Sequence, residues 1–165
     1  MDRLYAPWRT QYITNNTKID GCVFCHIAKS SSKEDEDLGV LYRDEEFFIV
    51  MNRYPYSPGH FMIIPNFHTD SLEDLDPKVF AKISNYTQKG VKMLKEVLNA
   101  QGVNIGMNLG KAAGAGIAEH IHLHLVPRWG GDTNFITTIA DTRIYGTDAN
   151  KIYEKLKESC ADYFR

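Results

Sequence analysis

Three of the six histidines occupy alternate positions, His120, His122 and His124, in the segment 120–126. Successive side chains of a strand point to opposite faces, so an extended backbone would place the three imidazoles on one face and the aliphatic residues between them on the other. Strand positions that face water usually carry Thr, Lys, Glu or Ser. Imidazole titrates near neutral pH, binds metals and can act as a nucleophile or base. The pattern therefore predicts a chemical site rather than a polar surface.

A loop of small residues, 110–116, leads directly into these histidines. Gly114 and Gly116 flank Ala115, and a residue without Cβ allows positive φ and a close backbone approach to a ligand. Consecutive backbone N–H groups in such loops can bind phosphate. A loop of this composition is often only a turn. The histidines that follow it favour the phosphate-binding interpretation.

Cys22 and Cys25 form a Cys-x-x-Cys pair that has four interpretations. A zinc site of two thiolates and two imidazoles could take its other ligands from His68 and one of the three alternating histidines. A thioredoxin-like redox pair would need a strand-to-helix context. Because His26 follows, the letters also match the haem-attachment pattern, but no export signal precedes them. The fourth interpretation is two thiols without a ligand, and the spacing favours zinc.

Composition limits the class of protein. The chain has 165 residues, of which 43% are hydrophobic, so we expect a single domain over residues 1–165. The net charge of -2 gives no electrostatic footprint for nucleic acid. No apolar run is long enough to span a bilayer and the first residues do not form a signal peptide, so we expect a cytoplasmic protein without a membrane partner.

The elements that must position these residues can be read from periodicity and capping. Asp76 and Pro77 predict the start of a long helix whose apolar residues continue to Leu98, with Gly102 placed to terminate it. Cys160 lies on the apolar side of a helix expected over 148–163, as a core residue.

The remaining segments predict strands, a loop and an arm. We expect strands at 40–43, 47–51, 61–65, 103–109 and 120–126, a solvated loop at 29–37 and an aromatic N-terminal arm at 1–20. Pro127 should end the last strand, because it cannot donate to a sheet ladder. This order of elements indicates an α+β domain with an antiparallel sheet.

Two ordered motifs carry a resemblance to a known family. The alternating histidines are preceded by Asn52-Arg53-x-Pro55-x-x-Pro58-Gly59-His60, and together they resemble the histidine-triad (HIT) family of nucleotide-binding hydrolases and transferases. The match runs from about Gly21 to Asp132. Flanking sequences at 6–9, 106–110 and 126–135 resemble the microbial branch that includes diadenosine tetraphosphate phosphorylases.

The resemblance implies nucleotidyl transfer in two steps. His122 would attack the α-phosphorus of a dinucleoside polyphosphate and form a nucleotidyl-histidine intermediate, which water or inorganic phosphate would resolve. His124 would bind the phosphoryl oxygens. The resemblance also implies a purine nucleotide substrate, a homodimer and a structural zinc ion. The implied zinc ligands are Cys22, Cys25, His68 and His120.

The resemblance also suggests nucleotide contacts. Asn52 matches a position that contacts ribose in relatives, and Asn108 matches a position near the phosphates. Either Asn could instead cap a turn. His60 is expected to be a hydrogen-bonded structural histidine rather than a catalytic one. The candidates for the purine pocket, chosen from position alone, are Phe24, Ile27 and Phe48.

One segment departs from the family pattern. Many relatives carry Gln, Ser or Thr three or four residues before the triad, where this chain has Gly116 and Ile117. Backbone N–H groups would have to replace that side chain at the phosphate or the leaving group. Two alternative functions therefore stay open at this point: hydrolysis of adenosine 5'-monophosphoramidates, and nucleotide binding without catalysis.

Overall fold

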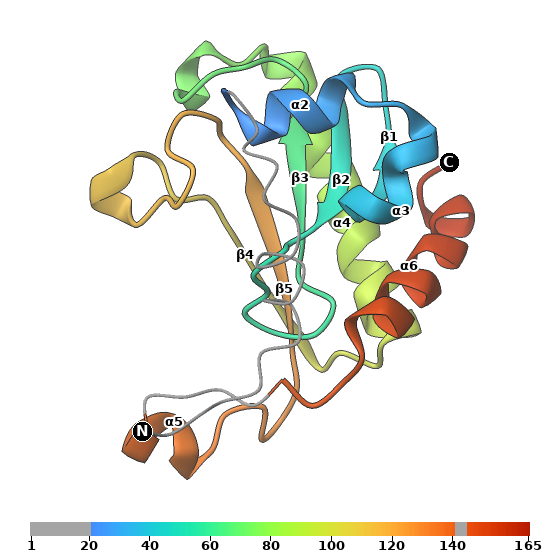
Figure 1. Cartoon of the computed structure of the whole chain (residues 1–165), viewed down its shortest axis with the longest axis vertical. Coiled ribbons are helices and arrows are strands. Elements are labelled where there is room, and N and C mark those ends of the chain that lie inside the picture. Colours follow the sequence, from blue (N-terminus) through green and yellow to red (C-terminus); the bar gives the residue numbers. More distant parts are fainter. Residues whose placement is uncertain (1–20, 141–144) are drawn as a thin grey trace.

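Five antiparallel strands form one sheet in the order β1-β2-β3-β5-β4, in a computed structural model that describes residues 21–140 and 145–165 (Figure 1). The strands are β1 (Val40–Arg43), β2 (Phe47–Met51), β3 (Phe61–Pro65), β4 (Gly102–Gly106) and β5 (Leu123–Arg128). The expected α+β class with an antiparallel sheet is confirmed. The arm expected at 1–20 lies outside the described residues.

Helices cover both faces of this sheet (Figure 1). α4 (Pro77–Val97) and α6 (Ala149–Tyr163) pack with one face in the larger hydrophobic cluster, and the short α2 (Val23–Lys29) covers part of the other. The shorter helical segments are η1 (Ser32–Glu34), α3 (Asp35–Leu38), η2 (Leu72–Asp74), η3 (Lys111–Ala113) and α5 (Phe135–Ala140). Within the described ranges, no helix combines the length and the hydropathy that crossing a membrane requires.

Coverage on both faces explains the continuous apolar run of β3. Phe61 and Ile63 belong to the cluster under α4, whereas Met62 and Ile64 belong to the cluster under α2. All four are buried, so this strand needs no polar alternation. The same alternation in β5 places Leu125 against α4 and His124 opposite Met62.

The long helix begins as expected and ends earlier. The Asp76 carboxylate accepts the N–H of Lys78 at 2.8 Å, with Pro77 in the first turn. The helix ends at its C-cap Leu98 because Asn99 adopts a left-handed conformation, φ 53°. The expectation that Gly102 terminates it is therefore wrong, since Gly102 already belongs to β4.

Two other expectations are corrected. Pro127 does not end its strand but lies within β5, paired with Val103. Pairing of β5 with β3 stops at Leu125, so at Pro127 the strand has a partner on one side only, which is where a sheet tolerates proline. The segment 29–37 is not a plain loop, because the Ser31–Glu34 capping box starts η1 there and α3 follows directly.

The strand expected at 103–109 ends at Gly106 and is more exposed than its alternation predicts. β4 lies at the edge of the sheet, and the Ile105 side chain is 51% exposed. The expectation that Cys160 is a core residue is confirmed, since it is buried in α6 within the larger cluster.

Candidate functional site

The three alternating histidines are buried and lie on one face, yet they have different partners. β5 begins at Leu123, so His120 and His122 lie in the segment just before it and His124 within it. His120 turns toward Cys22, whereas His122 and His124 face one another with ring centroids 4.8 Å apart. The site therefore has two parts: a cluster of side chains that could hold a metal ion, named the metal-binding cluster below, and a histidine pair.

The metal-binding cluster consists of Cys22, Cys25, His68 and His120, whose ligand atoms all lie within 4.8 Å of one another. Cys22 Sγ lies 3.4 Å from His120 Nδ1, and Cys25 Sγ lies 3.2 Å from His68 Nδ1. The two Nδ1 atoms are 3.3 Å apart, and Cys25 Sγ is 3.8 Å from His120 Nδ1. All four residues expected as ligands are thus brought together.

The four individual separations, 3.2 to 3.8 Å, fit a tetrahedral metal ion. Zn–S bonds of about 2.3 Å and Zn–N bonds of about 2.0 Å imply ligand atoms about 3.3 to 3.8 Å apart around a tetrahedral ion. His120 Nε2 lies 2.9 Å from the Pro65 carbonyl oxygen, to which it donates, so that Nδ1 has no proton and can bind a metal. The donor set and its orientation could therefore hold a metal.

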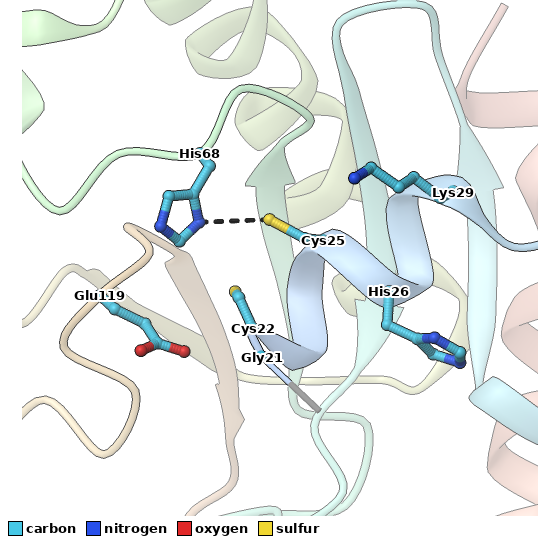
Figure 2. A pocket seen from close by; sticks show the side chains of 7 residues that line it. All are labelled: Gly21, Cys22, Cys25, His26, Lys29, His68 and Glu119. Carbon is cyan, nitrogen blue, oxygen red and sulfur yellow. Dashed lines mark hydrogen bonds between the residues drawn. The ribbon is translucent and has the colours of Figure 1, made fainter. Parts of the chain in front are cut away.

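α2 supplies both thiols because Cys22 is its N-cap and Cys25 follows three positions later, on the same side of the first turn. A pocket of about 520 Å³ opens beside the cluster and is also lined by Glu119, His26 and Lys29. Figure 2 shows that the His68 ring faces Cys25 and that Cys22 lies beside them, whereas the His26 ring points away. The haem-attachment interpretation of these letters therefore has no support from His26.

One hydrogen bond sets the tautomer of the His122 ring. Its Nδ1 lies 2.8 Å from the carbonyl oxygen of His120, which can only accept, so Nδ1 carries the proton and Nε2 carries the lone pair. The ring of Phe24, on α2, packs against His122 with centroids 5.2 Å apart. His122 thus presents an unprotonated nitrogen and is fixed in orientation from two sides.

A series of two hydrogen bonds sets which ring nitrogen of His124 carries the proton. The N–H of Tyr56 donates to His60 Nδ1 at 3.1 Å, which leaves the proton of neutral His60 on Nε2. That proton is donated to His124 Nδ1 across 2.9 Å. Neutral His124 must then carry its own proton on Nε2, as a donor. The expectation that His60 is hydrogen-bonded is confirmed, although its partner could not be inferred from the sequence.

Burial keeps these two imidazoles neutral. Desolvation, followed by the nearby His124 and His122, lowers the pKa of His60 to about 3. Desolvation, followed by His122, lowers the pKa of His124 to about 4. Near pH 7 His124 is therefore a hydrogen-bond donor without a positive charge.

Asn52 lies beside this pair. Its Oδ1 accepts the N–H of Tyr54 at 2.8 Å, as in a capped turn, and its Nδ2 lies 3.3 Å from His60 Nε2. Both nitrogens carry protons in this arrangement, so the second contact is not a hydrogen bond. Asn52 therefore both caps its loop and places an amide donor next to the histidine pair. Its contact with the ribose remains a prediction.

The other residues expected at the nucleotide lie in the loop 110–116 and just beyond β4. The N–H groups of Gly114 and Ala115 donate to Lys111 and Gly110 carbonyl oxygens, at 3.0 and 3.3 Å. Gly114 does have positive φ, 89°, whereas Gly116 does not. In this conformation the loop uses two of its expected phosphate donors internally. Asn108 is half-buried beyond the end of β4.

The three candidates for the purine pocket belong to one hydrophobic cluster. They are buried in the hydrophobic cluster between α2 and the sheet: Phe24, Ile27 and Phe48. The contact of Phe24 with His122 was not foreseen, because nothing in the spacing of residues 24 and 122 signals it. The purine pocket itself stays a prediction.

Comparison with known proteins identifies the family. The HIT domain family model matches residues 33–131. The chain is 38% identical over 152 residues to a protein named AP-4-A phosphorylase from Mycobacterium tuberculosis, covering 87% of this chain and 76% of that protein.

Solved structures agree. A zinc-bound histidine triad family protein from Mycobacterium smegmatis superposes with a TM-score of 0.69 and 33% identity, covering 86% of this chain and 94% of its own. A hypothetical histidine triad nucleotide-binding protein from Sulfolobus tokodaii gives a TM-score of 0.66 and 26% identity, covering 86% and 93%. The chain therefore belongs to the histidine-triad (HIT) domain family.

Proposed function

We propose that this protein is an enzyme that transfers a nucleotidyl group from a dinucleoside polyphosphate, such as diadenosine tetraphosphate. The observation that carries the proposal is the pair of hydrogen bonds, from His122 to the His120 carbonyl and from His60 to His124, that fixes the two tautomers. His122 Nε2 has the lone pair and His124 Nε2 has the proton, so a nucleophile and a hydrogen-bond donor lie side by side. The relative named AP-4-A phosphorylase supports the substrate class.

In the first step His122 Nε2 forms a bond to the α-phosphorus of diadenosine tetraphosphate. The bond from that phosphorus to the bridging oxygen breaks, and ATP leaves with the bond's electron pair. Nδ1–H of the modified imidazole stays hydrogen-bonded to the His120 carbonyl, which stabilises the positive charge that the ring acquires. His124 Nε2–H donates to a phosphoryl oxygen and stabilises its negative charge.

In the second step an oxygen of inorganic phosphate or of water attacks the same phosphorus, and the P–N bond to His122 breaks. Phosphate gives ADP, and water gives AMP and releases a proton. The nucleophile regains its lone pair on Nε2. Both outcomes use the same residues, so the identity of the second nucleophile must be decided by experiment.

The leaving group favours polyphosphate over phosphoramidate. An amine leaving group has to be protonated, whereas a nucleoside polyphosphate leaves as an anion. Because its pKa is lowered to about 4, His124 is neutral near pH 7. A neutral imidazole would have to become an imidazolate to give up its proton, so His124 is a poor general acid. The segment at Gly116 and Ile117 offers no polar side chain in its place.

A structural zinc ion is also proposed for the metal-binding cluster. The separations of the four ligand atoms and the zinc-bound relative from Mycobacterium smegmatis support it. Zinc there would cross-link α2 to the segment before β5 and needs no part in the chemistry. Since two thiolate ligands require reducing conditions, we infer a cytoplasmic location.

A homodimer through the edge of the sheet completes the proposal. β4 pairs only with β5 among the described strands, and its Ile105 side chain is exposed, so a second copy could extend the sheet there. Such pairing would satisfy the outer N–H and C=O groups of β4.

The test is product analysis with diadenosine tetraphosphate in the presence and absence of inorganic phosphate. ADP and ATP formed only with phosphate indicate phosphorolysis, and AMP and ATP without it indicate hydrolysis. His122→Ala should abolish turnover and the covalent nucleotidyl adduct, which mass spectrometry of quenched protein detects, while nucleotide binding is largely kept. Turnover by His122→Ala, or no turnover by the wild type, would disprove the proposal.

A further inference from the structure

α2 carries more of the site than its length suggests. It has only seven residues, too few to be a stable helix by itself. Even so, it positions Cys22 and Cys25 for the metal-binding cluster, and its Phe24 packs against His120 and His122. Contacts at its C-terminal end must therefore help to fix where the helix lies.

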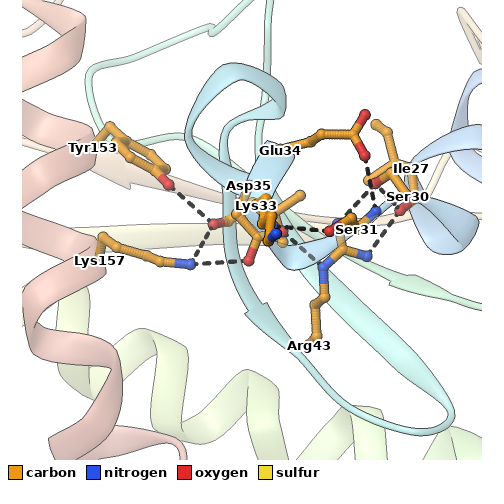
Figure 3. A network of polar contacts seen from close by, with 10 residues as sticks. Ile27, Ser30, Ser31, Lys33, Glu34, Asp35, Arg43, Tyr153 and Lys157 are labelled. Atoms are coloured by element: carbon orange, nitrogen blue, oxygen red, sulfur yellow. Dashed lines mark hydrogen bonds and ion pairs between the residues drawn. The ribbon is translucent and has the colours of Figure 1, made fainter.

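Arg43 provides those contacts from β1. Its Nη1 donates to the carbonyl oxygen of Ile27 at 2.8 Å, and its Nη2 donates to Ser30 Oγ at 2.9 Å. Its Nε donates to Asp35 Oδ1 at 2.7 Å. Figure 3 shows the guanidinium between the end of α2 and the start of α3. The three guanidinium nitrogens thus hold three separate acceptors.

The network extends to the C-terminal helix. Lys157 of α6 lies 3.3 Å from the other carboxylate oxygen of Asp35 and donates to the Val40 carbonyl at 2.8 Å. Tyr153 of α6 donates to the same carbonyl at 3.2 Å (Figure 3). Asp35 is 14% exposed and Arg43 is 22% exposed, so the pair is shielded from solvent more than an ordinary surface ion pair.

We propose that Arg43 is a positioning residue: by fixing the C-terminal end of α2 to β1, it holds Cys22 and Cys25 in ligand geometry and Phe24 against His122. The catalytic part of this inference rests on the function proposed above, and the metal part rests on the metal-binding cluster. Lysine cannot replace arginine here, because a single ammonium lacks the planar fork that reaches three acceptors at fixed angles.

The first test is the affinity of the full chain for Zn²⁺, measured by competition with a chromophoric chelator. Arg43→Ala should weaken Zn²⁺ binding about tenfold to a hundredfold, as loss of a group that orients ligands typically does. Arg43→Lys can still pair with Asp35 and should restore the affinity only in part.

Asp44→Asn is the matched control. Asp44 is a similarly shielded carboxylate next to Arg43, at 11% exposure, but its partner is Lys82 of α4 rather than α2. This variant should keep the wild-type Zn²⁺ affinity. Wild-type affinity in both Arg43 variants would overturn the proposal.

The second test is amide hydrogen exchange in the metal-free chain, which needs neither zinc nor turnover. Amides of α2 should exchange faster in Arg43→Lys than in the wild type, while amides of β3 are unchanged. Equal acceleration in α2 and β3 would show a general loss of stability and would overturn the proposal. If the wild type bound no Zn²⁺ or left diadenosine tetraphosphate intact, the earlier proposals would fail and the exchange test would still decide this one.

Discussion

His60 Nε2 donates to His124 Nδ1 across 2.9 Å, although 64 positions separate the two residues in the chain. The hydrogen bond makes His60 part of the site without direct contact with a substrate, because it decides which nitrogen of His124 carries the proton. The Tyr56 N–H fixes His60 in turn. A backbone group in a proline-rich loop is thereby linked to a side chain on β5.

Replacement of His60 should reduce catalysis more than binding. His60→Ala removes the donor that fixes the His124 tautomer, and we expect kcat for diadenosine tetraphosphate to fall by about a hundredfold with a small change in KM. His60→Gln keeps an amide N–H and should recover part of kcat. Steady-state kinetics of both variants provides the measurement, and equal kcat in wild type and His60→Ala would contradict it.

His60 and His124 should make the free energy of unfolding depend on pH. A histidine pKa of about 6.5 in the unfolded chain falls to about 3 for His60 and about 4 for His124 on folding. As the pH falls below about 6.5, the unfolded chain binds protons that the folded chain does not bind. The contribution of the two neutral histidines to the free energy of unfolding is therefore complete above about pH 6.5 and is lost as the pH falls toward 3. Each group contributes a slope of up to about 1.4 kcal/mol per pH unit.

Urea unfolding at about pH 7.5 and about pH 5, with chelator present so that metal release does not contribute, measures this slope. His60→Gln should give a shallower dependence than the wild type, because one of the two titrating groups is absent. Identical slopes for the two proteins would show that His60 does not titrate in this way.

Metal content should depend on His68 and not on His26. Both residues line the same pocket, but only His68 belongs to the metal-binding cluster, and the His26 ring points away from it (Figure 2). We expect about one zinc per chain in the wild type and in His26→Ala, and much weaker binding in His68→Ala. Elemental analysis measures the content.

Removal of the metal should also destabilise the fold. A chelator should lower the melting temperature of the wild type, because binding to the folded chain alone adds to its stability. The same chelator should have little effect on His68→Ala. An active wild type that contains no metal after purification without chelator would contradict this prediction.

The proposed dimer should depend on the edge of the sheet. Ile105→Lys places a charge on the exposed face of β4 and should shift the protein toward monomers in sedimentation velocity. Phe80→Lys, at a 39% exposed position on α4, is the control and should leave the oligomeric state unchanged. A wild type that is monomeric, or a dimer that Ile105→Lys does not weaken, would refute the dimer proposed here.

The elements that could be predicted are those whose signals are local. The start of α4 follows from Asp76 and Pro77, and the buried strand β3 follows from its apolar run. The end of α4 was predicted wrongly because Asn99, rather than the more usual glycine, adopts the left-handed conformation. The position of Pro127 inside β5 depends on where β3 stops pairing, and that is not a local property.

The chemistry of the site can be read from the amino-acid sequence: three alternating imidazoles, two thiols three positions apart, and motifs that belong to one family. How these groups divide their roles depends on long-range contacts in the folded chain. The Pro65 carbonyl accepts from His120 Nε2, which leaves its Nδ1 unprotonated beside the thiols, and His124 becomes a donor because His60 reaches it from the start of β3. Proton positions are set by hydrogen-bond partners that lie far apart in the chain, and folding alone brings those partners together.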